Sequence, residues 1–176
     1  SVYSDGIATH HLTLYRHNSG ALVFGAGTVQ WSWGLDGEHD RGSSTPDLRM
    51  QQATVNLFAD MSVQPATLQS GLVAATASTD ISAPDATITS PANSASVQVG
   101  TTVNITGTAT DSGGVVGGVE VSVDGGTTWH PATGRANWSY LWVPGAVGSV
   151  TIKSRAIDDS GNIETSPASI TVNVGS

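Results

Sequence analysis

The segment VEVSVDGGTTWHPA, residues 119–132, contains a complete β-hairpin pattern. Apolar and polar residues alternate over 119–123, which predicts a strand with one buried face. The sequence Asp124-Gly125-Gly126 supplies a tight turn, because glycine readily adopts the positive φ that such turns need. Residues 128–130 are then predicted to return as the second strand. This hairpin predicts that the surrounding chain is built of short antiparallel strands.

The same alternation extends to both sides of the hairpin. Further strands are predicted at 86–89, 102–106, 138–142, 149–153 and 169–174, and turn residues such as 159–162 separate them. About seven short strands within roughly ninety residues are typical of an immunoglobulin-like β-sandwich. We therefore expect residues 81–176 to form such a sandwich.

Two stretches of this region resemble known modules. VEVSVDGGTTWHPA and VTIKSRAIDDSGNIE (residues 150–164) resemble bacterial immunoglobulin-like and fibronectin type III-like domains. The pattern S-x-D-G-G-x-x-W is also similar to the C-terminal immunoglobulin-like dimerisation domain of sulfite-oxidase-type enzymes. The hairpin recurs widely, so the resemblance implies the fold of about half the chain and does not specify a function.

Residues 1–80 have a mixed pattern. A strand is predicted around 11–15, a turn at 17–20 and a second strand at 21–24. The second strand is an uninterrupted apolar run, which suits a strand covered on both faces. Residues 36–44 are predicted to form a polar loop. The whole chain is thus expected to be mostly β, with a small incomplete α/β segment followed by the sandwich.

One helix is predicted at about 46–63. Thr45 is a suitable N-cap and Pro46 suits the first helical position. Its apolar stripe repeats at i, i+4 and i+8, and we expect this stripe to pack on the sandwich or on another copy of the chain. The stripe consists of Ala53, Leu57 and Met61, flanked by Leu48, Val55 and Phe58.

The stretch THHLTLYRHNSGALVFGAGTVQWSWGLDGEHD, residues 9–40, resembles the C-terminal end of the N,N-dimethylformamidase large-subunit type of domain. The core of that domain looks like a class I glutamine amidotransferase layer. The resemblance implies that 21–25 is a late strand of a larger sheet and that the helix is its last covering helix. It also implies that the nucleophile or metal site lies upstream, so no catalytic residue is assigned in this chain.

The order and composition of these segments predict that the chain is a piece of a larger protein. Residues 74–84, AATASTDISAP, have the composition of a linker. The segment before it holds two strands and one helix, which make a thin core for its length. The chain also begins at Ser1 without methionine. We expect its partner to be the upstream part of the same protein or a second copy of the chain.

Composition limits the classes of function. Hydrophobic residues make up 38% and charged residues 11% of the chain, a balance typical of secreted β-rich modules, so a secreted or periplasmic location is expected. The net charge of -8 argues against nucleic acid and against an anionic membrane as partners. The absence of cysteine excludes disulfides, thiolate zinc sites and a cysteine nucleophile.

The acidic loop after the second strand is one candidate site. Asp36, Glu38, His39 and Asp40 combine oxygen ligands with one imidazole, which could hold a divalent metal. Their spacing matches no calcium-binding loop, and the alternative interpretations are a solvated or capping loop and a catalytic role. No other cofactor is predicted.

The aromatic side chains of the predicted strand at 138–142 form a second candidate. Trp138, Tyr140 and Trp142 lie on one face of the strand and could stack on sugar rings or fill the core of the sandwich. Asp111, Asp158 and Asp159 lie near turns and could bind calcium, although aspartate is also a common turn residue.

Three functions are consistent with these patterns. The first is a non-catalytic C-terminal fragment of a larger exported multidomain protein, in which the sandwich is a packing or interaction module. The second is part of a processed amidohydrolase-like enzyme, a hydrolase of C–N bonds active only with its upstream portion. The third is a carbohydrate-binding module.

Overall fold

The computed structural model describes residues 11–40 and 42–176. The chain divides into two compact units, which are called the first unit (residues 1–79) and the second unit (residues 80–176). The predicted division lay between residues 80 and 81. Each unit is described by itself.

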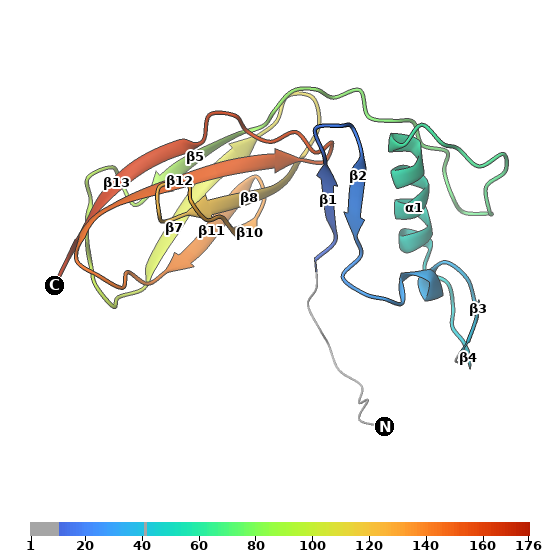
Figure 1. The fold of residues 1–176 in the computed structure, drawn as a ribbon, viewed down its shortest axis with the longest axis horizontal. Coiled ribbons are helices and arrows are strands. Elements are labelled where there is room, and N and C mark those ends of the chain that lie inside the picture. Colours follow the sequence, from blue (N-terminus) through green and yellow to red (C-terminus); the bar gives the residue numbers. More distant parts are fainter. Residues whose placement is uncertain (1–10, 41) are drawn as a thin grey trace. The chain divides into compact units, whose positions relative to one another are not determined.

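The second unit is a β-sandwich of two sheets with the strand orders β10-β11-β7-β5 and β6-β13-β12-β8-β9 (Figure 1). This architecture confirms the predicted immunoglobulin-like fold. All seven predicted strands are present, and β6 and β10 are two short additional strands. The bounds are β5 Asp85–Ser90, β6 Ser96–Gln98, β7 Val103–Thr110, β8 Val116–Ser122, β9 His130–Pro131, β10 Thr133–Gly134, β11 Asn137–Trp142, β12 Gly148–Asp158 and β13 Ala168–Gly175.

The pairing of β12 positions Asp158 at one end of the sandwich. This strand pairs antiparallel with β13 on one side and with β8 on the other. Its register with β8 shifts between Ile157 and Asp158, so Asp158 pairs with Val116. Such an irregularity redirects a side chain at the end of a strand. Asp158 is buried there, at the point where β12 ends.

The core of the sandwich is formed by inward-facing side chains from both sheets, as the alternation predicted. Ile105 and Trp138 come from the four-stranded sheet, and Val121 and Ile152 come from the five-stranded sheet. All four are at most 3% exposed. The core therefore supplies the hydrophobic stabilisation that a domain of this size requires.

The hairpin after β8 contains a compact hydrogen-bond network. The Ser122 hydroxyl donates to Asp124 Oδ1 over 2.7 Å and accepts from the Gly126 N–H over 2.8 Å. Gly125 and Gly126 have φ of 76° and 103°, as the turn required. The predicted return strand at 128–130 begins only at His130, because the Asp124 carboxylate accepts the Thr128 N–H and holds that residue in the turn.

The first unit contains small two-stranded sheets and one helix. Strand β1 (Thr13–Arg16) pairs antiparallel with β2 (Leu22–Gly25). A short 3-10 helix, η1 (Trp31–Gly34), follows, and the predicted polar loop contains the short pair β3 (Glu38–His39) and β4 (Gly42–Ser43). The expected cover on both faces of the second strand is wrong: Val23 is 57% exposed, so one face of β2 is left largely uncovered.

Helix α1 spans Leu48–Asp60, and its start differs from the prediction. Asp47, and not Thr45, is the N-cap, because its carboxylate accepts the Arg49 N–H over 2.8 Å while its own backbone is extended. Pro46 therefore precedes the helix. At 13 residues α1 is short, and within the described ranges no helix combines the length and apolar character needed to cross a membrane.

The buried face of α1 also differs from the predicted stripe. The buried residues are Gln51, Val55 and Ala59, whereas Met61 is 52% exposed. The cause is a polar side chain: Gln51 Nε2 donates to the Leu35 carbonyl over 2.7 Å and so turns its own face of the helix inward. Packing of the predicted stripe on the sandwich or on a second copy stays a prediction.

Candidate functional site

The acidic loop at 36–40 has local partners in the structure. Asp36 Oδ1 accepts the Glu38 N–H over 2.9 Å, as in a common turn. The His39 ring stacks on Trp33 with 4.3 Å between the ring centroids, and His39 Nε2 lies 3.1 Å from the Ser44 hydroxyl. These contacts fit the interpretation of the loop as a folded turn.

Metal-ligating atoms converge elsewhere. Within the part of the chain that the structure describes, the only group of three candidate ligand atoms lying within 4.8 Å of one another comes from Asp80, Asp111 and Asp158. The four residues predicted in the acidic loop, Asp36, Glu38, His39 and Asp40, do not form such a group. Metal binding by that loop stays a prediction.

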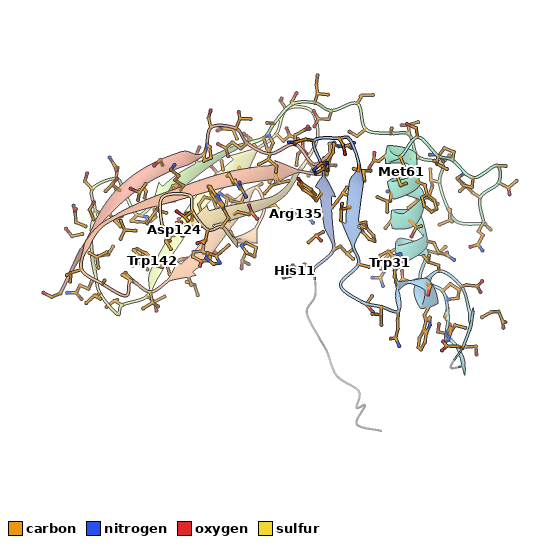
Figure 2. All side chains as sticks on the ribbon, viewed as in Figure 1. His11, Trp31, Met61, Asp124, Arg135 and Trp142 are labelled. Carbon is orange, nitrogen blue, oxygen red and sulfur yellow. The ribbon has the colours of Figure 1, made fainter. Side chains whose placement is uncertain are left out.

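The aromatic strand lies against the core. Trp138 is 3% exposed and belongs to the buried core, so its ring is not available to a ligand. Tyr140 and Trp142 are half-buried and pack against the same core, and Trp142 is labelled on the sandwich in Figure 2. The Tyr140 ring also stacks on His130 at a centroid distance of 6.0 Å. Ligand binding by Tyr140 and Trp142 stays a prediction.

The acidic cluster of Asp80, Asp111 and Asp158 lies wholly within the second unit. Asp111 directly follows β7, Asp158 ends β12, and Asp80 lies in the segment that leads into β5. The fold thus brings together one carboxylate from the entry of the chain into the sandwich and two from the ends of strands.

Asp158 is held in place by its own turn. Its Oδ1 accepts the N–H groups of Ser160 and Asn162 over 2.9 and 2.7 Å, and its Oδ2 accepts Asn162 Nδ2 over 2.7 Å. The same Asn162 amide donates to the Asp80 carbonyl over 3.2 Å. Asn162 therefore ties the turn after β12 to the segment that enters the sandwich.

The surroundings of Asp111 are different. Both of its carboxylate oxygens are buried, each exposing less than 1 Å², and neither has a hydrogen-bond partner. Close by, Gly114 packs tightly against the acids. A Cβ at this position would lie 2.6 Å from Asp159 Oδ1, 2.8 Å from Asp80 Oδ2 and 3.0 Å from Asp111 Oδ2. A shallow hollow lined by Asp111, Gly114 and Arg135 adjoins the acids.

The sequence analysis identified Asp111, Asp158 and Asp159 as acidic residues near turns, and the structure brings Asp111 and Asp158 together in one cluster. The sequence analysis did not identify Asp80. The available signal was a single acid in the predicted linker 74–84, which precedes the first predicted strand of the sandwich.

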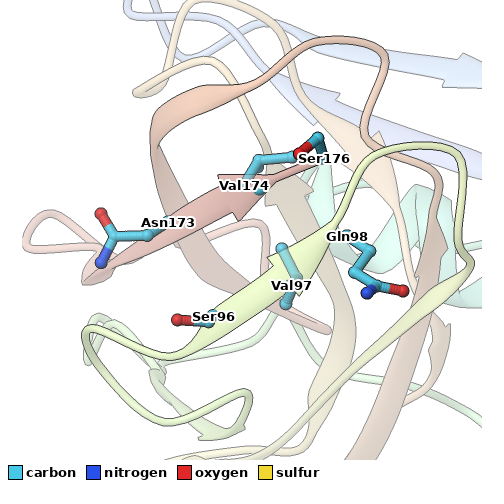
Figure 3. A pocket seen from close by; sticks show the side chains of 7 residues that line it. Ser96, Val97, Gln98, Asn173, Val174 and Ser176 are labelled. Carbon is cyan, nitrogen blue, oxygen red and sulfur yellow. The ribbon is translucent and has the colours of Figure 1, made fainter.

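A second hollow of the sandwich has no comparable chemistry. It is an open groove along the edge formed by β6 and β13, shown in Figure 3. No charged side chain lies among its lining residues, which are Ser96, Val97, Gln98, Asn173, Val174, Gly175 and Ser176.

Two packed sheets with this strand order define the class of immunoglobulin-like β-sandwich proteins. The chain belongs to the bacterial Ig domain family, which matches residues 84–172. A comparison with curated proteins finds no match.

Solved structures with related folds were also found. The fibronectin(III)-like modules of CbhA from Clostridium thermocellum share 28% identity, cover 51% of this chain and 96% of their own, and give a TM-score of 0.46. The PKD domain of an M14-like peptidase from a Thermoplasmatales archaeon shares 17% identity over 53% of this chain and 94% of its own, with a TM-score of 0.41. The sulfane dehydrogenase SoxCD from Paracoccus pantotrophus shares 27% identity over 47% of this chain and 23% of its own, with a TM-score of 0.41.

The family match lies entirely in the second unit. The resemblance of residues 9–40 to the dimethylformamidase type of domain stays a prediction.

Proposed function

We propose that this chain is a non-catalytic part of a larger exported protein, in which the sandwich is a packing or interaction module. Membership of the bacterial Ig domain family and a complete core of its own support a module that keeps its shape while neighbouring parts carry activity.

The first unit carries the observation on which the proposal rests. Its buried residues among those described are Gln51, Val55 and Ala59. In contrast, many of its large apolar side chains are exposed, so its buried core is thin for its length. The exposed set in this unit comprises Leu12, Tyr15, Val23, Val29, Leu48, Phe58, Met61, Val63 and Val73. Such a surface fits a unit that packs on another part of the same protein or on a second copy.

Hydrogen exchange on the 1–176 chain tests this proposal. If the first unit needs a partner, the amides of α1 should exchange far faster than those of β7 and β12 in the monomeric chain. They should become protected when the chain self-associates or when the upstream part of the protein is present. Strong protection of α1 in a monomer, measured together with sedimentation, would contradict the proposal.

The enzymatic alternative makes a different prediction. Hydrolysis of simple amides by the 1–176 chain alone would contradict a non-catalytic role. Activity that appears only when the upstream portion is added would support the processed amidohydrolase instead. A chain that stays inactive in both assays agrees with the packing module.

Carbohydrate binding is a second alternative, because Tyr140 and Trp142 keep part of their surface exposed. Retardation of the chain in a polysaccharide-containing gel, lost on Trp142→Ala, would support it. Leu141→Ala is the matched control, since this neighbour is 68% exposed on the opposite face of the same strand. Equal mobility with and without polysaccharide would exclude this alternative.

A further inference from the structure

We propose that Asp80, Asp111 and Asp158 bind a divalent cation of the calcium type at the end of the sandwich where the chain enters it. The proposal goes beyond the module function and is independent of it. A sandwich that binds no cation could still be a packing module, and a cation-binding sandwich could belong to an enzyme.

The spacing of the carboxylates is the first argument. One oxygen from each of the three residues lies within 4.8 Å of the other two. Calcium–oxygen bonds are about 2.3–2.6 Å long, so ligands on opposite sides of the ion are separated by about 5 Å. The three oxygens can therefore contact one ion without a rearrangement of the strands that carry them.

The state of Asp111 is the second and independent argument. Its two carboxylate oxygens are buried, and no described residue donates a hydrogen bond to them. An ionised carboxylate in that position is unfavourable unless a positive charge or hydrogen-bond donors compensate it. In contrast, the Asp158 carboxylate accepts three hydrogen bonds. A bound cation would compensate the buried negative charge of Asp111 and would also attract the carboxylates of Asp80 and Asp158.

Gly114 packs tightly beside the cluster. A Cβ at this position would lie 2.8 Å from Asp80 Oδ2 and 3.0 Å from Asp111 Oδ2, so only a residue without a side chain allows these carboxylates to lie where they do. Asp159 borders the cluster and its Oδ1 accepts the Val115 N–H over 3.1 Å, but it is not one of the three converging ligands.

The chemistry of the donors selects the class of ion. All of them are carboxylate oxygens, which favour hard cations over the zinc and copper ions that imidazole and thiolate bind. Magnesium requires bonds of about 2.0–2.1 Å and near-ideal octahedral geometry. Calcium accepts longer bonds and irregular coordination, so it suits oxygens that come from three separate segments and are spaced up to 4.8 Å apart.

Binding would join three segments that are distant in sequence. Asp80 is already linked to the turn after β12 through Asn162, and its Oδ1 accepts the Ser82 N–H over 2.9 Å. The ion would add direct bonds from this entry segment to the ends of β7 and β12. Calcium should therefore stabilise the sandwich and slow hydrogen exchange at residues 80–84.

Calorimetric titration of the metal-free 1–176 chain with calcium chloride tests the site. The wild type should bind one ion, and Asp111→Asn should weaken binding by at least about tenfold, since even groups that only support a ligand contribute that much. Asp36→Asn is the matched control, because it removes the same charge from the acidic loop of the first unit. It should leave the affinity unchanged.

A second variant protects the test against misfolding. Gly114→Ala keeps every charge, but its Cβ would push the oxygens of Asp80 and Asp111 away from their positions, so it should also weaken calcium binding while circular dichroism stays that of the wild type. Magnesium chloride should bind more weakly than calcium in the same titration. The proposal is overturned if millimolar calcium gives neither heat nor a rise in Tm. It is equally overturned if Asp36→Asn, and not Asp111→Asn, abolishes binding.

Discussion

Gly107 occupies a place on β7 where only a hydrogen atom fits. A Cβ there would collide with the Thr87 carbonyl oxygen and with the indole of Trp138. Both neighbours belong to strands paired with β7, so neither can move away without opening the sheet. Gly107→Ala should therefore lower the free energy of unfolding of the sandwich by about 3 kcal/mol, the upper part of the range for overpacked cores. Urea unfolding followed by tryptophan fluorescence measures this change.

Gly118 on β8 provides the control for that substitution, because a Cβ there would meet no atom within 4 Å. Gly118→Ala should be close to neutral, since it also restricts the unfolded chain. Equal losses in the two variants would mean that backbone entropy, and not contact with Trp138, explains the effect.

The hairpin residue Asp124 should make stability depend on pH. Hydrogen bonds from Thr128, and then from Ser122, hold the pKa of this carboxyl well below its ordinary value of 3.8. A depressed pKa in the folded state contributes stability that is present above the ordinary value and is lost as the pH falls through the folded value. Asp124→Asn should thus have a lower Tm than the wild type at pH 7, because the asparagine NH₂ group would face hydrogen-bond donors that the carboxylate accepts in the wild type.

The difference in Tm between wild type and Asp124→Asn should shrink steadily as the pH is lowered below 3.8. Asp36→Asn serves as the control, since it removes a carboxyl from the other unit. A difference that stays constant down to the lowest pH would show that the carboxylate charge is not what the Thr128 donors stabilise.

The residues of the candidate cation site were only partly predictable. Asp111 and Asp158 follow predicted strands, so their place near turns could be inferred from local pattern. Asp80 could not be assigned, because nothing in a linker sequence shows which strand ends it will meet after folding. Trp138 and Trp142 lie on the same face of β11, yet Trp138 is buried and Trp142 is only half-buried. Alternation predicts which face a side chain lies on, but not how completely the opposing sheet covers it.

At the scale of elements, Glu164 connects the two sheets of the sandwich. Its Oε2 accepts the Ala86 N–H of β5 over 3.1 Å and the Ala156 N–H of β12 over 2.9 Å. The side chain is only 7% exposed. Glu164→Ala would leave two buried donors without an acceptor and should destabilise the sandwich by about 3 kcal/mol. Glu164→Gln keeps a carbonyl acceptor and should cost less, as chemical unfolding at pH 4 can establish.

The Gln variant also isolates a pH effect of opposite sign to that of Asp124. Burial raises the pKa of Glu164 above its ordinary value of 4.5, and the nearby Asp85 raises it further. The contribution of this group is therefore complete below pH 4.5 and is lost as the pH rises through the raised pKa. The wild type should lose stability relative to Glu164→Gln over that rise. Parallel stability curves for the two proteins would refute the assignment.

Helix α1 shows what sequence periodicity does not detect within the first unit. Two stripes with a four-residue repeat exist; the more apolar one was predicted to pack on another surface, and the one buried within the unit contains Gln51 and, of the predicted flanking residues, Val55. The Gln51 amide is anchored to the Leu35 carbonyl and to Gln69 Oε1, contacts that hydrophobic periodicity does not detect. Val55→Ala should therefore destabilise the first unit by about 2 kcal/mol, as expected for a truncated buried side chain.

Met61→Ala is the comparison for Val55→Ala, because Met61 is 52% exposed at the C-cap of the same helix. In the monomeric chain this substitution should change stability little. Thermal unfolding of the helix, monitored by circular dichroism at low protein concentration, distinguishes the effects of the two variants. A large effect of Met61→Ala that grows with protein concentration would instead show that a second copy covers the originally predicted stripe.

At the scale of the whole molecule, the two units differ in how far sequence reasoning reaches. The sandwich was predictable because alternation, turn glycines and strand spacing all repeat along the chain and agree with one architecture. The first unit has too few elements for such agreement. Its strand bounds shifted by a residue or two, and the paired strands Glu38–His39 and Gly42–Ser43 fall in a predicted loop, since strands of two residues leave no periodic signal.

The division into two units with separate cores predicts two unfolding transitions in calorimetry of the 1–176 chain. Because a ligand that binds only the folded state stabilises it by an amount that grows with the logarithm of its concentration relative to Kd, calcium should raise the Tm of the sandwich transition alone. The transition of the first unit should stay where it is, and Val55→Ala should shift only that one. Gly107→Ala should lower the sandwich transition in both metal-free and calcium-loaded protein while preserving the calcium-dependent rise, since it lies outside the acidic cluster. If calcium instead moved the transition of the first unit, the cation would bind at the loop of Asp36, Glu38, His39 and Asp40, and the assignment to Asp80, Asp111 and Asp158 would be wrong.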